Sequence, residues 1–271
     1  MEGGSGEEPM SSSALVGYTG FVGGTLLRAR SFDTLINSRN TDEFRGREFD
    51  LVVHAGVPAV KWLANKEPAA DRAAIASIRD TLATVRIKEL IFISTIDVYP
   101  DTGAPADERA AIDPLRNHAY GQHRFELEQW VRGHFANVHI IRLPALFGEG
   151  LKKNVIFDLL NDNQVDRINP ASRFQWYPLR RLSSDIEMVR AHDARLVNLF
   201  PEPISTAAIV DAFFPDAPVG PAVEPAPSYD LRTRHGQLFG GPAGYQLDRD
   251  AVMDELSAFI TQERARRVCG A

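Results

Sequence analysis

The chain has 271 residues, of which 44% are hydrophobic and 24% charged, and its formal net charge at pH 7 is −6. These values are typical of a globular protein with one large core, or with one core and a small lobe. The acidic balance argues against nucleic acid as the main partner, and no apolar run approaches the ~20 residues that a membrane helix needs. The one cysteine, Cys269, cannot form a disulfide within the chain, which indicates a reducing, cytoplasmic setting.

A glycine-rich turn stands near the beginning of the chain. Residues 1–13 lack the basic and apolar regions of a signal peptide, so we expect a disordered leader or tag there. An apolar run from residue 14 then enters a turn that carries Gly17, Gly20 and Gly23 and continues as a helix. Glycine permits positive φ and lets backbone N–H groups approach a pyrophosphate at a helix N-terminus. The turn therefore predicts a dinucleotide site, although the same spacing also arises from packing alone.

Strand-like and helix-like segments alternate from residue 14 to about residue 148. We expect strands at 14–16, 34–37, 51–54, 90–94 and 138–142, and helices at 70–85 and 120–135. This alternation predicts an α/β fold with a doubly wound (Rossmann) parallel sheet and helices on both faces. Ligands of such sheets lie beyond the carboxyl ends of the strands, where Gly17, Ser38, Ala55, Thr95 and Pro144 are expected together.

The second part of the chain has a different character. Helices are expected at 154–160, from a Ser205 or Thr206 cap to residue 213, and at 248–266. An aromatic and basic stretch covers 173–181, and prolines are frequent over 215–227. We interpret 14–150 as a dinucleotide-binding core and 151–271 as a mixed part that forms a substrate lobe and a closing helix.

Three further segments, read with the glycine turn, resemble the extended short-chain dehydrogenase/reductase superfamily, which contains the NAD-dependent epimerases and dehydratases. They are Ser-Thr-Ile-Asp-Val-Tyr at 94–99, Tyr-Gly-Gln-His-Arg at 120–124 and Arg-Leu-Pro-Ala-Leu-Phe-Gly at 142–148. The short segment before residues 49–56 is most similar to the dTDP-4-dehydrorhamnose reductase and GDP-fucose synthase branch. The resemblance covers about residues 14–160. It implies hydride transfer between a nicotinamide and a carbonyl or carbinol of a nucleotide-sugar-like small molecule, by a reductase or epimerase that forms a homodimer.

The resemblance also implies a catalytic set. Tyr120 would be the acid/base, because a phenol suits this task when nearby positive charge lowers its pKa. Thr95 would orient the substrate oxygen, and Arg124 occupies the position of the superfamily's lysine. Arginine keeps the charge, but its planar head does not copy an ammonium. The alternative function is that of a non-catalytic NAD(P)-binding sensor or partner protein, in which this change marks the loss of chemistry.

The choice of cofactor depends on the segment after the second strand. An acidic residue there binds the adenosine 2′-hydroxyl, and an arginine binds a 2′-phosphate. Residues 37–40 contain Arg39 and no carboxylate precedes Asp42, which favours NADP(H), although the lack of an acid is also compatible with NAD(H). The expected cofactor contacts are Gly17, Thr19, Gly20, Phe21, Val22, Ser38, Arg39, Asn40, Ala55, Gly56, Val57, Ser94, Tyr120, Arg124, Leu143 and Pro144.

The reaction subclass and the substrate contacts follow less directly. Dehydratases of the superfamily carry Asp-Glu after the threonine, whereas this chain has Ile96-Asp97, so ordinary dehydration is not expected. Nothing in the sequence identifies a second acid/base for an epimerase, and carbonyl reduction requires the fewest groups. No histidines have metal-ligand spacing, so no metal is expected. Candidate substrate residues, which are equally compatible with a core or a subunit interface, are Asp97, Arg173, Trp176, Tyr177 and Arg180.

Overall fold

The computed structural model describes residues 12–270, so residues 1–11 of the expected leader lie outside the described residues. A six-stranded sheet runs in the order β2-β1-β3-β4-β5-β8, and all neighbouring strands are parallel. Its strands are β1 (Ser13–Val16), β2 (Thr34–Ile36), β3 (Glu48–His54), β4 (Arg86–Thr95), β5 (Val138–Leu143) and β8 (Leu196–Asn198).

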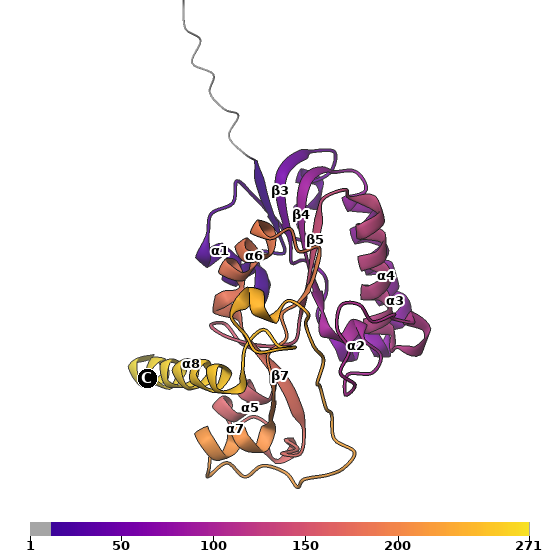
Figure 1. The fold of residues 1–271 in the computed structure, drawn as a ribbon. Coiled ribbons are helices and arrows are strands. Elements are labelled where there is room, and N and C mark those ends of the chain that lie inside the picture. The colour runs from indigo at the N-terminus through magenta and orange to yellow at the C-terminus, as the bar shows by residue number, and fades with distance from the viewer. Residues whose placement is uncertain (1–11, 271) are drawn as a thin grey trace, which may run out of the picture.

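Helices cover both faces of this sheet (Figure 1). One face carries α1 (Phe21–Ala29) and α6 (Leu182–Ala191), and the other carries α3 (Pro68–Leu82) and α4 (Ala119–His134), with the short α2 (Lys61–Lys66) before α3. The predicted Rossmann fold is thus confirmed. Because both faces are covered, the strands read as continuous apolar runs: in β4, Ile91 and Ile93 pack under α1 and α6, while Leu90 and Phe92 pack under α3 and α4.

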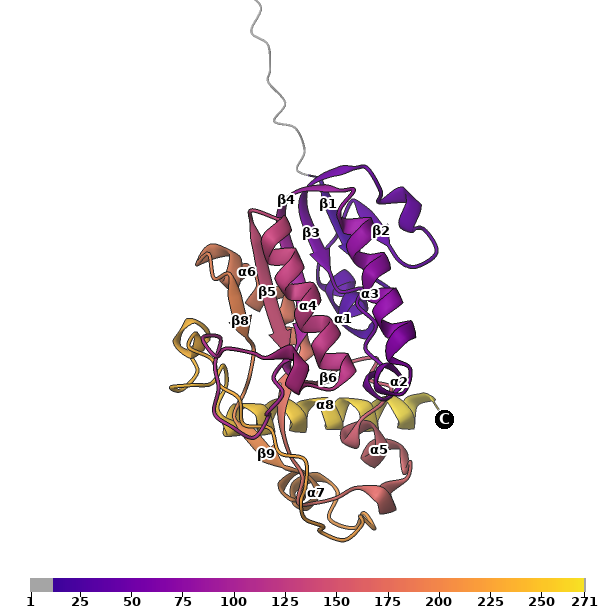
Figure 2. The ribbon, with the colours of Figure 1, turned by 90° about the vertical axis from the view of Figure 1, so that its right-hand side faces the viewer.

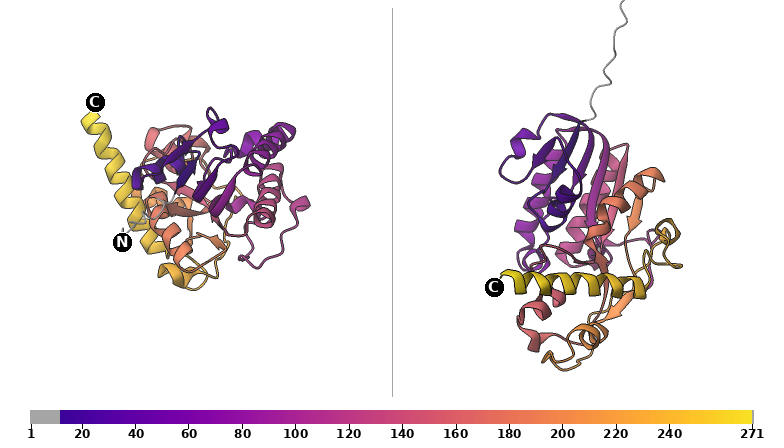
Figure 3. Two further views of the ribbon diagram at one scale, coloured as in Figure 1. Left: turned by 90° about the horizontal axis from the view of Figure 1, so that it is seen from above. Right: turned by 90° about the vertical axis from the view of Figure 1, so that its left-hand side faces the viewer.

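A smaller lobe lies beyond the carboxyl ends of the large sheet. It contains a three-stranded sheet, β6 (Ala145–Phe147), β7 (Arg173–Pro178) and β9 (Pro203–Ser205), with the helices α5 (Val155–Asn161) and α7 (Thr206–Phe213). The long α8 (Arg249–Gly270) crosses between the two parts in Figure 2 and in the right-hand view of Figure 3. Trp176, Ile204 and Val252 belong to the core that holds this lobe together.

The division of the chain at residue 150 does not coincide with the layers of the structure. Residues 182–198 come from the second part of the chain, yet α6 and β8 complete one face and one edge of the large sheet. The apolar positions Leu182, Ile186 and Val189 recur at helical spacing and are fully or almost fully buried there. Ser205 caps α7 as expected, since its hydroxyl accepts a hydrogen bond from the Ala208 N–H at 3.2 Å.

Candidate active site

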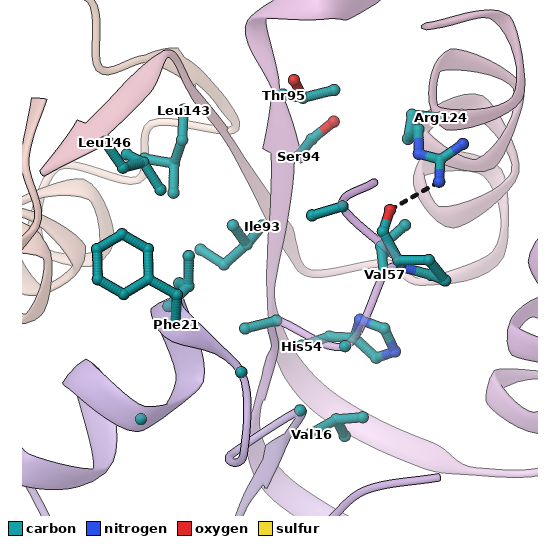
Figure 4. Close-up of a pocket in the computed structure, with 18 of the residues that line it drawn as sticks. Val16, Phe21, His54, Val57, Ile93, Ser94, Thr95, Arg124, Leu143 and Leu146 are labelled. Atoms are coloured by element: carbon teal, nitrogen blue, oxygen red, sulfur yellow. Dashed lines mark hydrogen bonds between the residues drawn. The ribbon is translucent and has the colours of Figure 1, made fainter. Parts of the chain in front are cut away.

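A cavity of about 1170 Å³ opens at the carboxyl ends of β1, β3, β4 and β5. Gly17, Ala55 and Thr95 line it from the large sheet, while Phe174 and Tyr229 line it from the smaller lobe. Figure 4 shows β4 in the middle of this cavity, with Phe21 on one side and Arg124 on the other. Its volume suits a dinucleotide with a second small molecule, because ordinary ligand pockets occupy about 300–1,000 Å³.

The glycine turn is built for close approach of backbone to backbone. Gly17 has φ +86°, and a Cβ there would lie 2.6 Å from the Ala55 carbonyl oxygen. A Cβ on Gly23 would lie only 2.1 Å from the Gly17 carbonyl oxygen, so α1 starts directly against the turn. Gly20, the N-cap of α1, carries no side chain over the first turn of the helix. The helix N-terminus is thereby presented to the cavity, the arrangement that binds phosphate oxygens.

The turn after β2 is held by asparagine side chains. Asn37 donates from its side-chain amide to the Tyr18 hydroxyl at 3.0 Å and accepts from the Arg39 N–H at 2.8 Å. Asn40 accepts from the Asn37 N–H and donates to the Leu35 carbonyl oxygen. Ser38 lines the cavity, whereas Arg39 is exposed and, like Asn40, lies outside the cavity wall. No carboxylate therefore occupies the end of β2.

Tyr120 and Thr95 meet where α4 packs on the end of β4. A Cβ on Gly121 would lie 2.0 Å from the Asp97 carbonyl oxygen, so only glycine lets the helix approach so closely. Asn117 fastens the same contact through a 2.9 Å hydrogen bond from its amide to that carbonyl. Burial raises the pKa of the Tyr120 phenol above its ordinary value, although the Arg124 charge and a hydrogen bond with Thr95 act to lower it.

Arg124 is held in a buried pair with Asp71 of α3. The guanidinium bonds both carboxylate oxygens, with Nη2 at 2.8 Å from Oδ1, and Nη2 also donates to the Pro58 carbonyl oxygen at 2.7 Å (Figure 4). Its Cζ lies 3.9 Å from the centroid of the Tyr120 ring. The side chain is only 3% exposed, and its Nε has no hydrogen-bond partner among the described residues. Arg124 thus keeps its positive charge beside the ring of Tyr120, and its buried Nε–H is left unpaired among the described residues.

Ser94 and His54 are two further polar groups of the cavity wall. Ser94 donates its hydroxyl to Glu128, which in turn forms a buried ion pair with Arg142. His54 lies under the floor of the cavity, stacked on Phe92, and burial lowers its pKa to about 4. These contacts fix the wall, and they leave Tyr120, Thr95 and Asp97 as the polar groups at the end of β4.

Most of the candidate residues named from the sequence line this one cavity. They are Gly17, Thr19, Gly20, Phe21, Val22, Ser38, Ala55, Gly56, Val57, Ser94, Thr95, Asp97, Tyr120, Arg124, Leu143 and Pro144. The candidates in the aromatic and basic stretch lie elsewhere. Trp176 and Tyr177 are fully buried, each in a hydrophobic core, and Arg180 pairs with Glu255 of α8. Arg173 is exposed and outside the wall, so the structure favours the core interpretation of this stretch.

The cavity also contains side chains that the sequence did not single out. Lys61 and Tyr229 contact Asp97, and Phe174 packs beside Tyr229 with ring centroids 5.6 Å apart. Lys153 reaches across from the segment after β6 to the Ala59 carbonyl oxygen at 2.8 Å. Lys61, Lys153 and Tyr229 come from loops and from the short α2, where no periodic pattern or motif gave a signal, whereas Phe174 belongs to β7 and to the aromatic and basic stretch.

The described residues give no indication of a metal centre or a membrane span. No group of three or more His, Cys, Asp or Glu side chains within 12–267 is arranged to hold a metal ion. None of the helices formed by the described part of the chain is both long and apolar enough to cross a bilayer.

Comparison with known proteins gives a family and several similar folds. The sequence model of the NAD dependent epimerase/dehydratase family matches residues 14–170. No curated protein shows a significant sequence match.

Solved structures resemble the chain over almost its whole length. A dTDP-4-dehydrorhamnose reductase from Yersinia enterocolitica is 17% identical with a TM-score of 0.70, and the match covers 93% of this chain and 99% of that one. A UDP-N-acetylglucosamine 4-epimerase from Methanobrevibacter ruminantium, in complex with UDP-N-acetylmuramic acid, is 13% identical with a TM-score of 0.73 over 94% and 99% of the chains. A dTDP-4-dehydrorhamnose reductase from Bacillus anthracis, in complex with NADP, is 15% identical with a TM-score of 0.69 over 93% and 99%.

Proposed function

Because the chain belongs to the NAD-dependent epimerase/dehydratase family, we propose that its cavity binds NADP(H) beside a nucleotide sugar and that Tyr120 moves the proton that accompanies hydride transfer. The chain is an enzyme, an oxidoreductase or epimerase of this family. The alternative of a non-catalytic sensor is therefore set aside.

One observation carries the proposal. Tyr120, Thr95 and Arg124 converge on the wall of the cavity that also receives the glycine turn. The wall suits a dinucleotide, since the glycine turn brings the N-terminus of α1 to the cavity with no side chain over its first turn. Similar folds in complex with NADP, with NAD or with a UDP-sugar support a nicotinamide cofactor beside a nucleotide sugar.

The chain's own groups divide the work. A bound nicotinamide supplies or accepts the hydride. Thr95 donates a hydrogen bond to the substrate oxygen and orients it, and the Tyr120 hydroxyl gives that oxygen a proton during reduction or takes one during oxidation. Arg124, stacked on the ring of Tyr120, stabilises the phenolate that forms during reduction.

NADP(H) is the proposed cofactor because no acid follows β2. The side-chain amide of Asn37 makes both of its hydrogen bonds within the turn. Asp42, the first carboxylate after β2, is paired with Arg45, with 3.7 Å between its Oδ1 and the arginine Nε. Arg39, exposed beside this turn, is proposed to contact the 2′-phosphate. Calorimetric titration should show tighter binding of NADP⁺ than of NAD⁺, and Arg39→Ala should abolish the difference. Binding of neither nucleotide, with none released on denaturation, would contradict the proposal.

Activity provides the second test. Wild-type protein should oxidise NADPH in the presence of a nucleotide ketosugar, dTDP-4-keto-6-deoxyglucose. Tyr120→Phe should reduce this rate at least about 100-fold and leave the NADP⁺ affinity within a few-fold, because only proton transfer is lost. Tyr245→Phe is the matched control, since that phenol bonds Asp230 and lies outside the cavity wall. Normal turnover by Tyr120→Phe would show that the acid/base assignment is wrong.

The cytoplasmic location and the homodimer stay predictions from the sequence. Sedimentation of the purified protein checks the second of them.

A further inference from the structure

The guanidinium of Arg124 gives all of its terminal hydrogen bonds to the protein. Nη1 donates to Oδ2 of Asp71 and, at 3.3 Å, to the Tyr120 carbonyl oxygen. Nη2 donates to Oδ1 of Asp71 at 2.8 Å and to the Pro58 carbonyl oxygen at 2.7 Å (Figure 4). Each terminal nitrogen of an arginine carries two hydrogens, and the fifth donor of this side chain, Nε–H, is buried. Arg124 therefore offers no accessible donor to a molecule in the cavity.

Asp71 has a fixed position and a fixed charge. It lies in the first turn of α3, where the helix dipole favours a negative charge. Nδ1 of His123 lies 2.7 Å from Oδ2, the oxygen that also accepts from Nη1 of Arg124. Burial would raise the pKa of this carboxyl, but the hydrogen bonds from Arg124 and His123 outweigh it, so the group is ionised near pH 7. The guanidinium is thus bound to an acceptor that cannot turn away.

Asp71 can influence a reaction in the cavity only through this arginine. Its side chain is outside the cavity wall, whereas Arg124 and Tyr120 line it. Cζ of the guanidinium lies 3.9 Å from the centroid of the Tyr120 ring, which is a cation–π contact. Burial raises the pKa of the Tyr120 phenol, and the Arg124 charge is the strongest of the effects that lower it. The place of the guanidinium on the ring therefore governs how readily the phenol gives up its proton.

We propose that Asp71 is a positioning residue of this site, which turns the guanidinium of Arg124 onto the face of the Tyr120 ring and withholds it from the cofactor. Arg124 then acts on the phenol by its charge, and other groups of the wall bind the cofactor. The inference rests on the proposed function, since it assigns how Tyr120 is kept able to give and take a proton. It also replaces the expected contact between Arg124 and the cofactor by a contact with Tyr120.

Nitrogen–proton NMR of the arginine side chains tests the position of the guanidinium without substrate or cofactor. The Nε–H signal of Arg124 is identified by its loss in Arg124→Lys. We expect it upfield of the signals of exposed arginines, because this group has no hydrogen-bond partner among the described residues and lies beside the face of an aromatic ring. Tyr120→Phe should keep this shift, and Tyr120→Leu should remove most of it. Asp71→Asn should move the signal toward the exposed arginines, because an amide offers one acceptor oxygen to the two terminal nitrogens.

Two further variants separate positioning from a general effect on the fold. Asp71→Glu keeps the buried negative charge but is longer by one methylene, so it should fold and still displace the Arg124 signal. Glu126→Gln breaks an ion pair with Arg72 between the same two helices, where the nitrogen–oxygen distance is 2.8 Å and the side chains are 38% and 54% exposed. It should leave the Arg124 signal and the turnover unchanged, because this exposed pair lies outside the cavity wall.

The affinity for NADP⁺ tests whether the guanidinium is withheld from the cofactor. Arg124→Gln should bind NADP⁺ within about 5-fold of the wild type in calorimetry, because all of its terminal donors are used within the protein. A larger loss of affinity would show that Arg124 contacts the cofactor, and it would overturn this part of the proposal.

A double-mutant cycle tests the effect on turnover, with NADPH and dTDP-4-keto-6-deoxyglucose. Arg124→Lys should lower kcat at least about 10-fold and leave KM within about 3-fold, because the ammonium is drawn to Asp71 and away from the phenol. Asp71→Asn with Arg124→Lys should recover to within about 5-fold of the wild-type kcat. Without the carboxylate, a lysine four residues after Tyr120 lies on the same side of α4 and can approach the phenol. Losses that multiply in the double variant would overturn the positioning role.

The outcomes separate this inference from the proposed function. An Arg124 signal that does not depend on Asp71 overturns the positioning role even if the protein oxidises NADPH with the ketone. A signal that depends on Asp71 supports the role even if NADPH is not consumed, in which case the hydride-transfer proposal fails.

Discussion

Replacement of Asp71 by asparagine is expected to lower the free energy of unfolding at pH 7 by about 3 kcal/mol. The side chains of Asp71 and Arg124 are only 6% and 3% exposed, and the guanidinium bonds both carboxylate oxygens. The variant leaves a buried positive charge without its counter-ion, and breaking such a pair typically costs about 3–5 kcal/mol. Asparagine retains one acceptor oxygen, which places the expected loss at the lower end of that range.

Urea denaturation followed by circular dichroism measures this loss. Asp80→Asn on the same helix is the matched control, because the Asp80 side chain is 66% exposed and its partner Arg79 lies 3.7 Å away. This surface change should alter the free energy of unfolding by less than about 0.5 kcal/mol. A loss below about 1 kcal/mol in Asp71→Asn would refute the argument that breaking this pair leaves the buried charge of Arg124 uncompensated.

The pH dependence of the free energy of unfolding tests the same ion pair independently. Burial would raise the pKa of Asp71, but the hydrogen bonds from Arg124 and His123 outweigh it and hold the pKa below its ordinary value. A carboxyl whose pKa is lower in the folded state stabilises the fold above its unfolded pKa, ~3.9, and loses that contribution as the pH falls through the folded pKa. The difference between wild type and Asp71→Asn should therefore be full at pH 7 and shrink below about pH 4. A difference that stays constant through this acid range would contradict the assignment.

Two further predictions concern the cavity wall. Gly23→Ala should lower the NADP⁺ affinity at least about 10-fold in calorimetry, because its Cβ would lie 2.1 Å from a carbonyl oxygen of the turn. Gly133→Ala is the control and should bind NADP⁺ as the wild type does, because the space around its Cβ is open. Normal binding by Gly23→Ala would contradict the close-packed turn. In an ultraviolet difference titration of the protein without cofactor, the phenol that Tyr120→Phe removes should ionise above about pH 10, and Arg124→Gln should raise its pKa further. A fall in that pKa would show that the guanidinium does not stabilise the phenolate.

Five of the six strands of the large sheet and the position of the cavity could be predicted because local patterns determine them, whereas β8 and the helix α6 were not predicted. Four short apolar runs, now parts of β1, β3, β4 and β5, could not be amphipathic helices, and their alternation with helical segments requires a parallel sheet. In a parallel sheet all carboxyl ends lie at one edge, so Gly17, Ala55 and Thr95 had to lie together wherever the loops went. The sequence of each segment was enough for this result.

The part of the cavity wall around Asp97 could not be predicted, because contacts between residues far apart in the chain determine it. Lys61 and Tyr229 lie 36 and 132 residues from Asp97, on a short helix and a loop without periodicity. The aromatic run of β7 gave an ambiguous pattern for a physical reason. Trp176 packs in the core of the smaller lobe and Tyr177 in that of the large sheet, so the strand is buried on both faces. In the sequence, these buried aromatic residues next to arginines look the same as a binding surface made of cations and aromatic rings.

The arginine in the lysine position can be understood only together with Asp71. A guanidinium needs more hydrogen-bond acceptors than an ammonium that points into a ligand, and α3 supplies them through a carboxylate that accepts two bonds. With these bonds made, the guanidinium carbon still lies 3.9 Å from the centre of the Tyr120 ring. A lysine placed here alone would be drawn toward the same carboxylate, so it would not recreate the superfamily's arrangement. The substitution is thus one half of a pair, and the motif at 120–124 gives no sign of the other half because Asp71 lies 53 residues earlier in the chain.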